Sequence, residues 1–259
     1  MNKQKAKILM LVEGEKTDVV LMKHLLAIYG ISDRHQIVSY NTNIYVLYNR
    51  MFKEDDPNSL DLLQVLKENE KDETKKKIFD ERYSDILLIF DLDPQDNLFS
   101  AMKIHQMLEF FNESSENGKL YINYPMVESF YHMKRVPDLD YNTYTVSMVE
   151  LQQKTYKSRV QNENRDHDYR KFARNLAECN TVISQNIEKA LLITNNPISD
   201  NPLPPLASDI LNAQVSKIER EKCLFILCTC GFYIIDYNPN LINQNDEQKL
   251  SIQNFEEKQ

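Results

Sequence analysis

The strongest constraint on the fold is a run of five apolar residues, Ile8 to Val12, that ends at Glu13 and Gly14. An unbroken apolar run of this length is typical of a strand that is covered on both faces, as in a parallel sheet. Gly14 permits a sharp turn that a bulkier residue would resist. From Thr17 to Tyr29 apolar residues recur at helical spacing, which predicts an amphipathic helix. The Glu13 carboxylate is therefore expected at the carboxyl end of a buried strand, where open α/β sheets place their sites.

Three further strands are expected in the first half of the chain, because short apolar runs alternate there with helical patterns. The expected strands are Gln36–Tyr40, Asp85–Phe90 and Leu120–Tyr124. The expected helices between them are Asn43–Lys53, the long charged segment Leu60–Tyr83, and Leu98–Phe111. Strands that alternate with helices are typical of a parallel sheet with right-handed crossovers. The sequence therefore predicts an α/β fold with a Rossmann-like parallel sheet flanked by helices.

The second half of the chain has a different pattern. From Met126 to Gln259 the periodicity is mainly helical, and the proline-rich stretch Pro197–Pro205 predicts a loop. The apolar run Cys223–Ile235 is compatible with a buried helix or with a strand, and its periodicity does not decide between them. The polar tail from Asn243 is expected to fray.

The net charge of −8 over 259 residues argues against a protein that holds nucleic acid by electrostatic attraction alone. It does not exclude a nuclease, because bound metal cations would reverse the local charge. The four cysteines lack zinc-ligand spacing and are expected to be buried thiols in a reducing cytoplasm. The first apolar run stops at Glu13, too early for a signal peptide, and no run approaches the roughly 18 residues of a membrane span. A cytoplasmic protein that does not enter the membrane is therefore expected.

Acidic residues stand where the expected strands end. They are Glu13 after the first strand, Asp91 and Asp93 after the third, and Glu128 beyond the fourth. Side chains two apart on a strand share a face, so Asp91 and Asp93 are expected to point toward one ion. Magnesium takes oxygen ligands, of which usually one or two are carboxylates. Any one acid could be a turn former or a helix cap, but four acids that each close a strand favour a metal site.

Two of these acidic segments resemble the motifs of a known domain. Leu11–Asp18, LVEGEKTD, resembles the Glu-Gly motif that opens the Toprim domain of topoisomerases, primases and OLD-type nucleases, and Ile89–Asp93, IFDLD, resembles its Asp-x-Asp motif. Within the first, EGEKTD is most similar to the EGEKTE signature of RloB-like and AbiL-type phage-defence proteins. Asp18 stands where that family usually has Glu. The family's NP-x-x-E segment is similar to Asn123–Glu128, which carries one inserted residue.

The resemblance implies a Toprim catalytic domain over residues 1–135, with a mainly helical region, residues 136–259, packed on it. Glu13 would be a metal ligand or the general acid and base. Asp91 and Asp93 would be the main ligands of Mg²⁺, for which Mn²⁺ could substitute. Asp18 and Glu128 would complete a second metal site, so that two ions stabilise an in-line displacement at phosphorus.

The function implied by the resemblance is metal-dependent cleavage of a nucleic-acid backbone. The chain would be an endonuclease and the effector of an antiviral, abortive-infection system that works with an ATPase partner. The substrate could be DNA, transfer RNA or another RNA, and a homodimer is left open. No topoisomerase tyrosine domain or primase zinc module is evident, which favours hydrolysis. Two alternatives stay open: a non-catalytic Toprim-fold assembly subunit, and a Toprim phosphotransferase of primase or topoisomerase type.

One clearly basic stretch, Gln152–Arg174, follows the acidic motifs. It holds three aromatic residues, Tyr156, Tyr169 and Phe172, so it could combine phosphate contact with base stacking, or it could be a solvated pair of helices. OLD-type Toprim nucleases are thought to use a lysine from the region after the acidic motifs. That resemblance assigns a catalytic role to Lys157, with Lys154, one helical turn earlier, as the rival. The remaining alternative is that Lys157 is only a surface residue.

Overall fold

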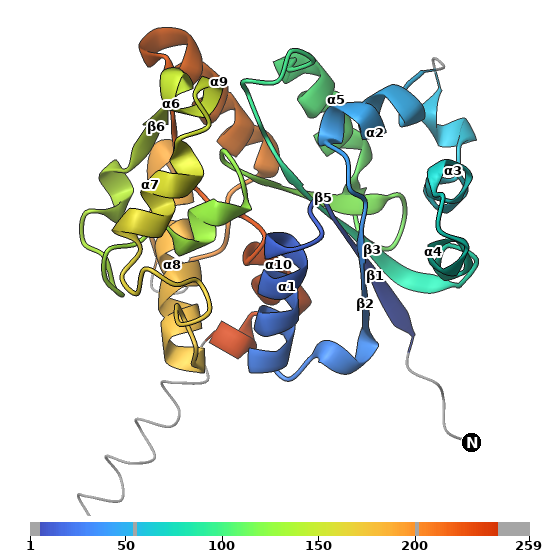
Figure 1. Cartoon of the computed structure of the whole chain (residues 1–259), viewed down its shortest axis with the longest axis horizontal. Coiled ribbons are helices and arrows are strands. Elements are labelled where there is room, and N and C mark those ends of the chain that lie inside the picture. Colours follow the sequence, from blue (N-terminus) through green and yellow to red (C-terminus); the bar gives the residue numbers. More distant parts are fainter. Residues whose placement is uncertain (1–5, 54–55, 200–201, 243–259) are drawn as a thin grey trace, which may run out of the picture.

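The computed structural model describes residues 6–53, 56–199 and 202–242, and its centre is a five-stranded sheet in the order β2-β1-β3-β5-β4 (Figure 1). The strands are β1 (Lys7–Val12), β2 (His35–Ser39), β3 (Tyr83–Asp91), β4 (Asn112–Glu113) and β5 (Gly118–Asn123). Strands β1, β2, β3 and β5 pair in parallel, as the apolar runs predicted. The two-residue strand β4, which is too short to leave a sequence pattern, joins β5 in the antiparallel direction.

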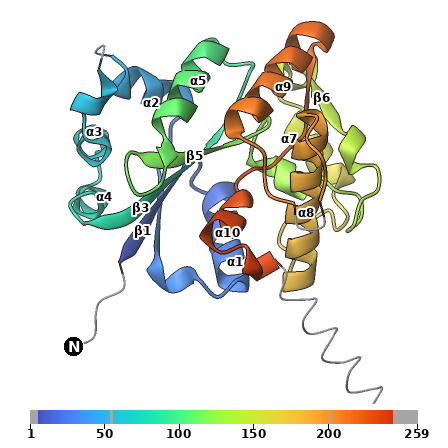
Figure 2. The ribbon, with the colours of Figure 1, turned by 180° about the vertical axis from the view of Figure 1, so that it is seen from behind.

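Helices cover both faces of this sheet. Helices α1 and α10 lie on one side, and α2, α3, α4 and α5 lie on the other (Figures 1 and 2). Their bounds are α1 (Thr17–Ile28), α2 (Ile44–Met51), α3 (Leu62–Asn69), α4 (Glu73–Ile78), α5 (Ala101–Phe110) and α10 (Phe232–Tyr237). The short 3₁₀ helices are η1 (Ser32–Arg34), η2 (Pro57–Ser59), η3 (Val127–Tyr131) and η4 (Tyr141–Thr143). The chain is therefore an α/β protein with a mostly parallel sheet flanked by helices.

The prediction of one long helix over Leu60–Tyr83 is wrong. The segment forms two short helices, α3 and α4, separated at residues 70–72. Each has its own aspartate cap, because Asp61 accepts from the backbone N–H of Gln64 at 3.0 Å and Asp72 accepts from Thr74 at 2.7 Å. An aspartate that bonds the backbone in this way starts a new helix more readily than it continues an old one.

The second half of the chain consists mainly of helices that stand together beside the sheet (Figures 1 and 2). The remaining elements are α6 (Met148–Gln152), α7 (Tyr156–Glu163), α8 (Leu176–Ile193), α9 (Ala207–Glu221), and the antiparallel pair β6 (Thr145–Ser147) and β7 (Cys223–Phe225). The run Cys223–Ile235 contains both of the expected structures, because it begins with strand β7 and ends in helix α10. The described part of Pro197–Pro205 forms no helix or strand, and the tail from Asn243 lies outside the described residues.

Backbone hydrogen bonds join the two halves at the end of β5. Tyr124 and Leu227 exchange two N–H···O bonds of 2.8 Å, and the Thr229 hydroxyl donates to the Ile122 carbonyl at 2.8 Å. Buried apolar side chains from both halves form one continuous core. In the described residues, no helix combines the length and the apolarity needed to cross a bilayer.

Candidate metal centre

Glu13 and Asp91 meet because β1 and β3 are neighbours and end at the same edge of the sheet. The Glu13 backbone N–H donates to the Ile89 carbonyl at 3.0 Å, which continues the β1–β3 ladder past Val12. The Asp91 N–H in turn donates to the Glu13 side-chain Oε2 at 3.1 Å. Glu13 is therefore held against the end of β3 by the sheet itself.

Asp91 is buried and tightly oriented. Its Oδ1 accepts from the backbone N–H of Val127 at 2.8 Å and from the Asn123 side-chain amide at 3.4 Å. Two donors on one oxygen fix the plane of the carboxylate and satisfy that atom. The other oxygen receives no hydrogen bond from the described residues, which leaves it for a proton or a cation.

The turn after β1 brings Asp18 into the same region. A side chain on residue 14 would place its Cβ 2.5 Å from Asp18 Oδ2, so any residue larger than glycine would displace the Asp18 carboxylate from this position. Asp18 lies in the first turn of α1 and is only 5% exposed. Its Oδ1 is buried and has no hydrogen-bond partner among the described residues. A buried oxygen without a donor is costly, and a bound cation would relieve that cost.

Asp93 and Glu128 approach from two other segments. Strand β3 ends at Asp91, and Asp93 has a φ of 42°, so strand alternation does not bring Asp91 and Asp93 onto one face as predicted. Asp93 is oriented instead by the Gln95 side-chain amide, which donates to it at 2.9 Å. Glu128, on η3, is 3% exposed, and its Oε2 is a second buried oxygen without a partner in the described part of the chain.

These carboxylates lie close enough together to affect one another's pKa values. Burial, followed by the charge of Asp93, raises the pKa of Glu13 to about 8. Burial and then the charges of Glu13, Asp18, Asp93 and Glu128 raise the pKa of Asp91 well above its usual range. Burial also raises the pKa values of Asp18 and Asp93. Such a cluster is unfavourable when fully ionised, and protons or cations would stabilise it.

These side chains are of the kind that a hard divalent cation binds, but they do not surround a single ion. All five are carboxylates, and two of them carry buried oxygens that lack partners. No three His, Cys, Asp or Glu residues in the described ranges are close enough together to enclose one ion. A cation here would be held by one or two carboxylates and by water, which is the usual arrangement for Mg²⁺.

Comparisons of the chain with protein-family models, with curated proteins and with solved structures found no match. The resemblance to Toprim motifs therefore stays a prediction from the sequence around Glu13, Asp91 and Asp93.

Of the two candidate lysines, the structure brings Lys157 to the acids. Its Nζ lies 2.9 Å from Glu128 Oε1 at the start of α7. Burial alone would lower the pKa of Lys157, but the carboxylates of Glu128, Asp91 and Asp93 together outweigh this effect and raise it. Lys154 is exposed, has a φ of 59°, and pairs with no carboxylate in the described ranges. The catalytic role of Lys157 stays a prediction, now with a position that suits it.

Asn123 is a supporting residue that sequence reasoning missed. It is fully buried, donates to Asp91, and accepts from the backbone N–H groups of Thr229 and Cys230 at 3.2 and 3.3 Å. The loop before α10 thus orients Asp91 through Asn123. The motif match included Asn123, but no local pattern connects it with a segment more than a hundred residues later.

The basic stretch is less open than its sequence suggests. Its arginines are largely paired, with Arg159 bound to Glu150 and Glu163, and Arg165 bound to Asp166 and Glu178. Tyr156 and Phe172 are each 1% exposed and belong to the core. Tyr169 is the one of the three aromatic residues that is only partly buried. The pairing of Arg159 and Arg165 and the burial of Tyr156 and Phe172 therefore leave fewer side chains of Gln152–Arg174 for contact with nucleic acid than the sequence suggests.

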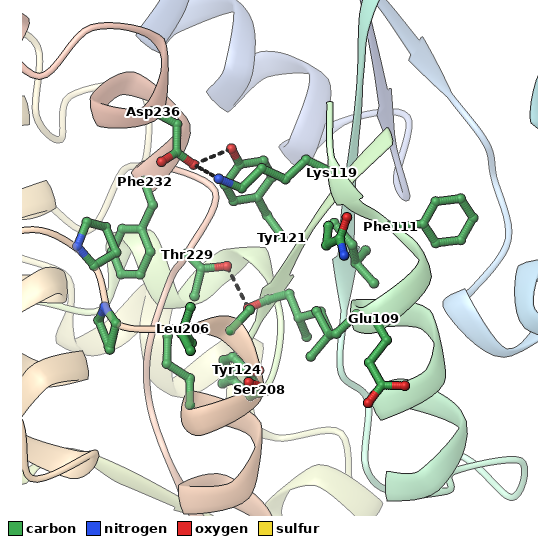
Figure 3. Close-up of a pocket in the computed structure, with 18 residues that line it drawn as sticks. Glu109, Phe111, Lys119, Tyr121, Tyr124, Leu206, Ser208, Thr229, Phe232 and Asp236 are labelled. Carbon is green, nitrogen blue, oxygen red and sulfur yellow. Dashed lines mark hydrogen bonds and ion pairs between the residues drawn. The ribbon is translucent and has the colours of Figure 1, made fainter. Parts of the chain in front are cut away.

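A separate cavity of about 400 Å³ lies between β5, α5, α9 and α10. Figure 3 shows that the Asp236 carboxylate faces both Lys119 and Tyr121, and its Oδ2 lies 2.6 Å from both the lysine Nζ and the phenol oxygen. The cavity wall is mostly apolar and includes Leu206 and Phe232. None of the predicted site residues lines this cavity, so it is not part of the acidic site.

The raised pKa of Glu13 predicts how stability depends on pH. Between the ordinary value of 4.5 and the folded value of about 8, the folded protein keeps a proton that the unfolded chain has released. The metal-free protein should therefore lose stability as the pH rises from about 5 to 8. Glu13→Gln should melt at a higher temperature than the wild type at pH 8 and show a weaker pH dependence in thermal denaturation with EDTA.

Glu15→Gln is the matched control, because Glu15 is an exposed acid in the same turn. The melting temperature of Glu15→Gln should equal that of the wild type at every pH. A Glu13→Gln variant that melts below the wild type at pH 8 would show that the ionised carboxylate stabilises the fold, which contradicts the prediction.

Proposed function

We propose that this chain is a Mg²⁺-dependent nuclease of Toprim type that hydrolyses phosphodiester bonds. One observation carries the proposal: carboxylates from four separate segments lie near one another at the carboxyl edge of a parallel sheet, and two of their buried oxygens lack partners among the described residues. This edge is where open α/β sheets bind ligands. The segments that resemble the Glu-Gly and Asp-x-Asp motifs of the Toprim domain lie at the ends of β1 and β3.

Each side chain then has a distinct role. Asp91, oriented by Val127 and Asn123, would hold a cation together with Asp93. Asp18 and Glu128 would hold a second. Bound Mg²⁺ would supply Lewis-acid stabilisation of the phosphate oxygens and a lowered pKa of coordinated water.

Glu13 is suited to proton transfer rather than to charge alone. Without metal, burial and the charge of Asp93 raise the pKa of Glu13 to about 8. Bound cations would lower this pKa, so at neutral pH Glu13 would be ionised and able to act as a general base. Lys157, beside Glu128, would place a positive charge close to the phosphate. Such a charge stabilises the negative charge that develops in the transition state.

The motif EGEKTD extends the proposal to a biological setting. Its similarity to RloB-like and AbiL-type proteins supports an effector nuclease of an anti-phage system that works with an ATPase partner. An ATPase gene beside the gene for this chain, and release of nuclease activity when both proteins are present, are the observations that test this part.

The proposed activity is tested by incubating the purified protein with single-stranded and duplex DNA, transfer RNA and unstructured RNA, each with Mg²⁺, Mn²⁺ or EDTA. Metal-dependent hydrolysis of at least one class, with products that carry free ends, supports the proposal. Rejoined or extended products would instead indicate a strand-passage enzyme or a primase. Cleavage that persists in EDTA would overturn the role of the acids.

A non-catalytic assembly subunit is the second candidate, and one observation favours it. Within the described residues the acids form no closed metal cage. If the chain is only an assembly subunit, it would bind its partner protein equally well after the acids are neutralised, and metal ions would not change its stability.

Metal binding separates these two candidates by a thermal measurement. Millimolar Mg²⁺ or Mn²⁺ should raise the melting temperature of the wild type, because a ligand that binds only the folded state stabilises it by mass action. Removal with EDTA should reverse the shift, and Asp91→Asn should eliminate it. Asp85→Asn is the matched control, since Asp85 lies on the same strand at its other end. Equal melting temperatures of the wild type with and without metal would count against the metal site.

A further inference from the structure

A groove of about 540 Å³ begins at the acidic site and runs along α7. Its lining residues are Glu128, Lys157, Ser158, Gln161, Asn162 and Tyr169. The charged pair Glu128 and Lys157 stands at the acidic site, and the other lining residues are uncharged. The groove therefore changes from an ionic end to a wall of hydroxyl, amide and aromatic groups.

Tyr169 presents a fixed aromatic ring to this groove. Its ring stacks on Tyr131, with centroids 4.3 Å apart and planes 8° from parallel. Tyr131 is buried, whereas Tyr169 is only partly buried and lines the groove. The covered face is thus held by the core while the ring stays accessible. An aromatic side chain that is anchored in this way loses little conformational entropy when a flat ligand stacks on it.

Tyr131 of the stacked pair lies on the same 3₁₀ helix, η3, as the Glu128 carboxylate. Tyr131 and Glu128 lie three residues apart on η3, which is one turn of a 3₁₀ helix with a rise of about 6 Å. Tyr169 therefore stands a short, fixed distance from Glu128. A nucleotide whose phosphate lies at the acids could place its base along the groove.

Helix α7 supplies the polar side of the groove. Ser158, Gln161 and Asn162 are spaced so that they share one face of the helix with Lys157. All of these side chains are exposed, and the Gln161 amide donates to the His167 carbonyl, which ties the loop before Tyr169 to the helix. Hydroxyl and amide groups can both donate and accept, as the polar edges of nucleobases require.

We infer that this groove is a subsite for an unpaired nucleobase, namely the base of a nucleotide next to the cleaved phosphate. The inference rests on the proposed nuclease function and specifies its substrate class. The base stacks on Tyr169, its polar edge meets the amides of Gln161 and Asn162, and its phosphate lies toward Lys157. A base in a duplex cannot reach this ring without leaving its stack, so the subsite selects single-stranded or flipped-out nucleotides.

The inference is tested by the binding of a labelled single-stranded oligothymidylate to the full chain, measured by fluorescence anisotropy with Ca²⁺ in place of Mg²⁺. Tyr169→Leu should weaken binding by about tenfold, the scale of one lost base stack, and Tyr169→Phe should retain it within about twofold. An oligonucleotide of the same length with abasic sites should bind equally to the wild type and to Tyr169→Leu. Tyr48→Leu is the matched control, because Tyr48 is a partly buried tyrosine stacked on Phe52.

The outcomes separate this inference from the proposed function. If the wild type cleaves the oligonucleotide and Tyr169→Leu binds it equally well, the subsite is wrong and the nuclease stands. If the wild type neither binds nor cleaves any nucleic acid, both are wrong. Should Tyr169→Leu fail to fold, the exposed double variant Ser158→Ala, Asn162→Ala replaces it. Weaker binding of the base-bearing oligonucleotide alone supports the subsite, and unchanged binding overturns it.

Discussion

Replacement of Asp91 by asparagine is expected to abolish Mg²⁺-dependent cleavage, with a loss of about a thousandfold or more in single-turnover rate. A metal-held phosphoryl oxygen gains several kcal/mol of stabilisation in the transition state, and each 1.36 kcal/mol is a factor of about ten. Asparagine keeps the shape of Asp91, and its oxygen can still accept from the Val127 N–H. The change therefore removes the charge that the cation needs and leaves the local structure in place.

The fold of Asp91→Asn should remain intact. Burial and neighbouring carboxylates raise the pKa of Asp91 well above its usual range, so the ionised group is unfavourable in the metal-free protein. Thermal denaturation in EDTA should show a variant at least as stable as the wild type. Asp85→Asn serves again as the control and should cleave at the wild-type rate. Full Mg²⁺-dependent activity in Asp91→Asn would remove Asp91 from the site.

The parallel sheet could be predicted because its strands are buried on both faces. Ile8–Val12 and Asp85–Phe90 leave nearly unbroken apolar runs, and the acids that follow them mark the strand ends. Because these two strands were expected to end at one edge of the sheet, Glu13 and Asp91 were expected to lie together. The parallel pairing of β1 with β3 and the hydrogen bond from the Asp91 N–H to Glu13 confirm this proximity. The role of Gly14 was predicted only in part. The turn was expected, but the contact of residue 14 with the Asp18 carboxylate depends on side-chain packing that no pattern records.

Other features depend on contacts between residues that are distant in the chain. Tyr156 and Phe172 lie in a basic stretch and look accessible by sequence, yet both are in the core. Tyr156 is buried because α7 packs against η3, and the ring of Phe172 packs against two aromatic residues of η3, Phe130 and Tyr131. The run Cys223–Ile235 is apolar throughout, so periodicity could not show that it begins as a strand beside β6 and ends as a helix over the sheet. Local patterns predict elements, and tertiary packing decides which faces are covered.

The second large effect is expected at Lys157. Its Nζ contacts Glu128 and lies within electrostatic reach of Asp91 and Asp93, whereas Lys154 pairs with no carboxylate in the described residues. Lys157→Ala should lose about a hundredfold in single-turnover rate at saturating Mg²⁺ and substrate, the scale of one removed charge-stabilising donor. Lys154→Ala is the control and should cleave at close to the wild-type rate.

Saturation with metal is essential to the interpretation of Lys157→Ala. Without Lys157, Glu128 would be a buried carboxylate with no ion-pair partner in the described part of the chain, which would change its affinity for a metal ion. A rate that recovers fully at high Mg²⁺ would make Lys157 a positioning residue for Glu128. A rate that stays low at every Mg²⁺ concentration would assign its charge to the transition state. Equal, small losses of binding in both lysine variants, with unchanged saturated rates, would place Lys157 among the phosphate contacts of the surface.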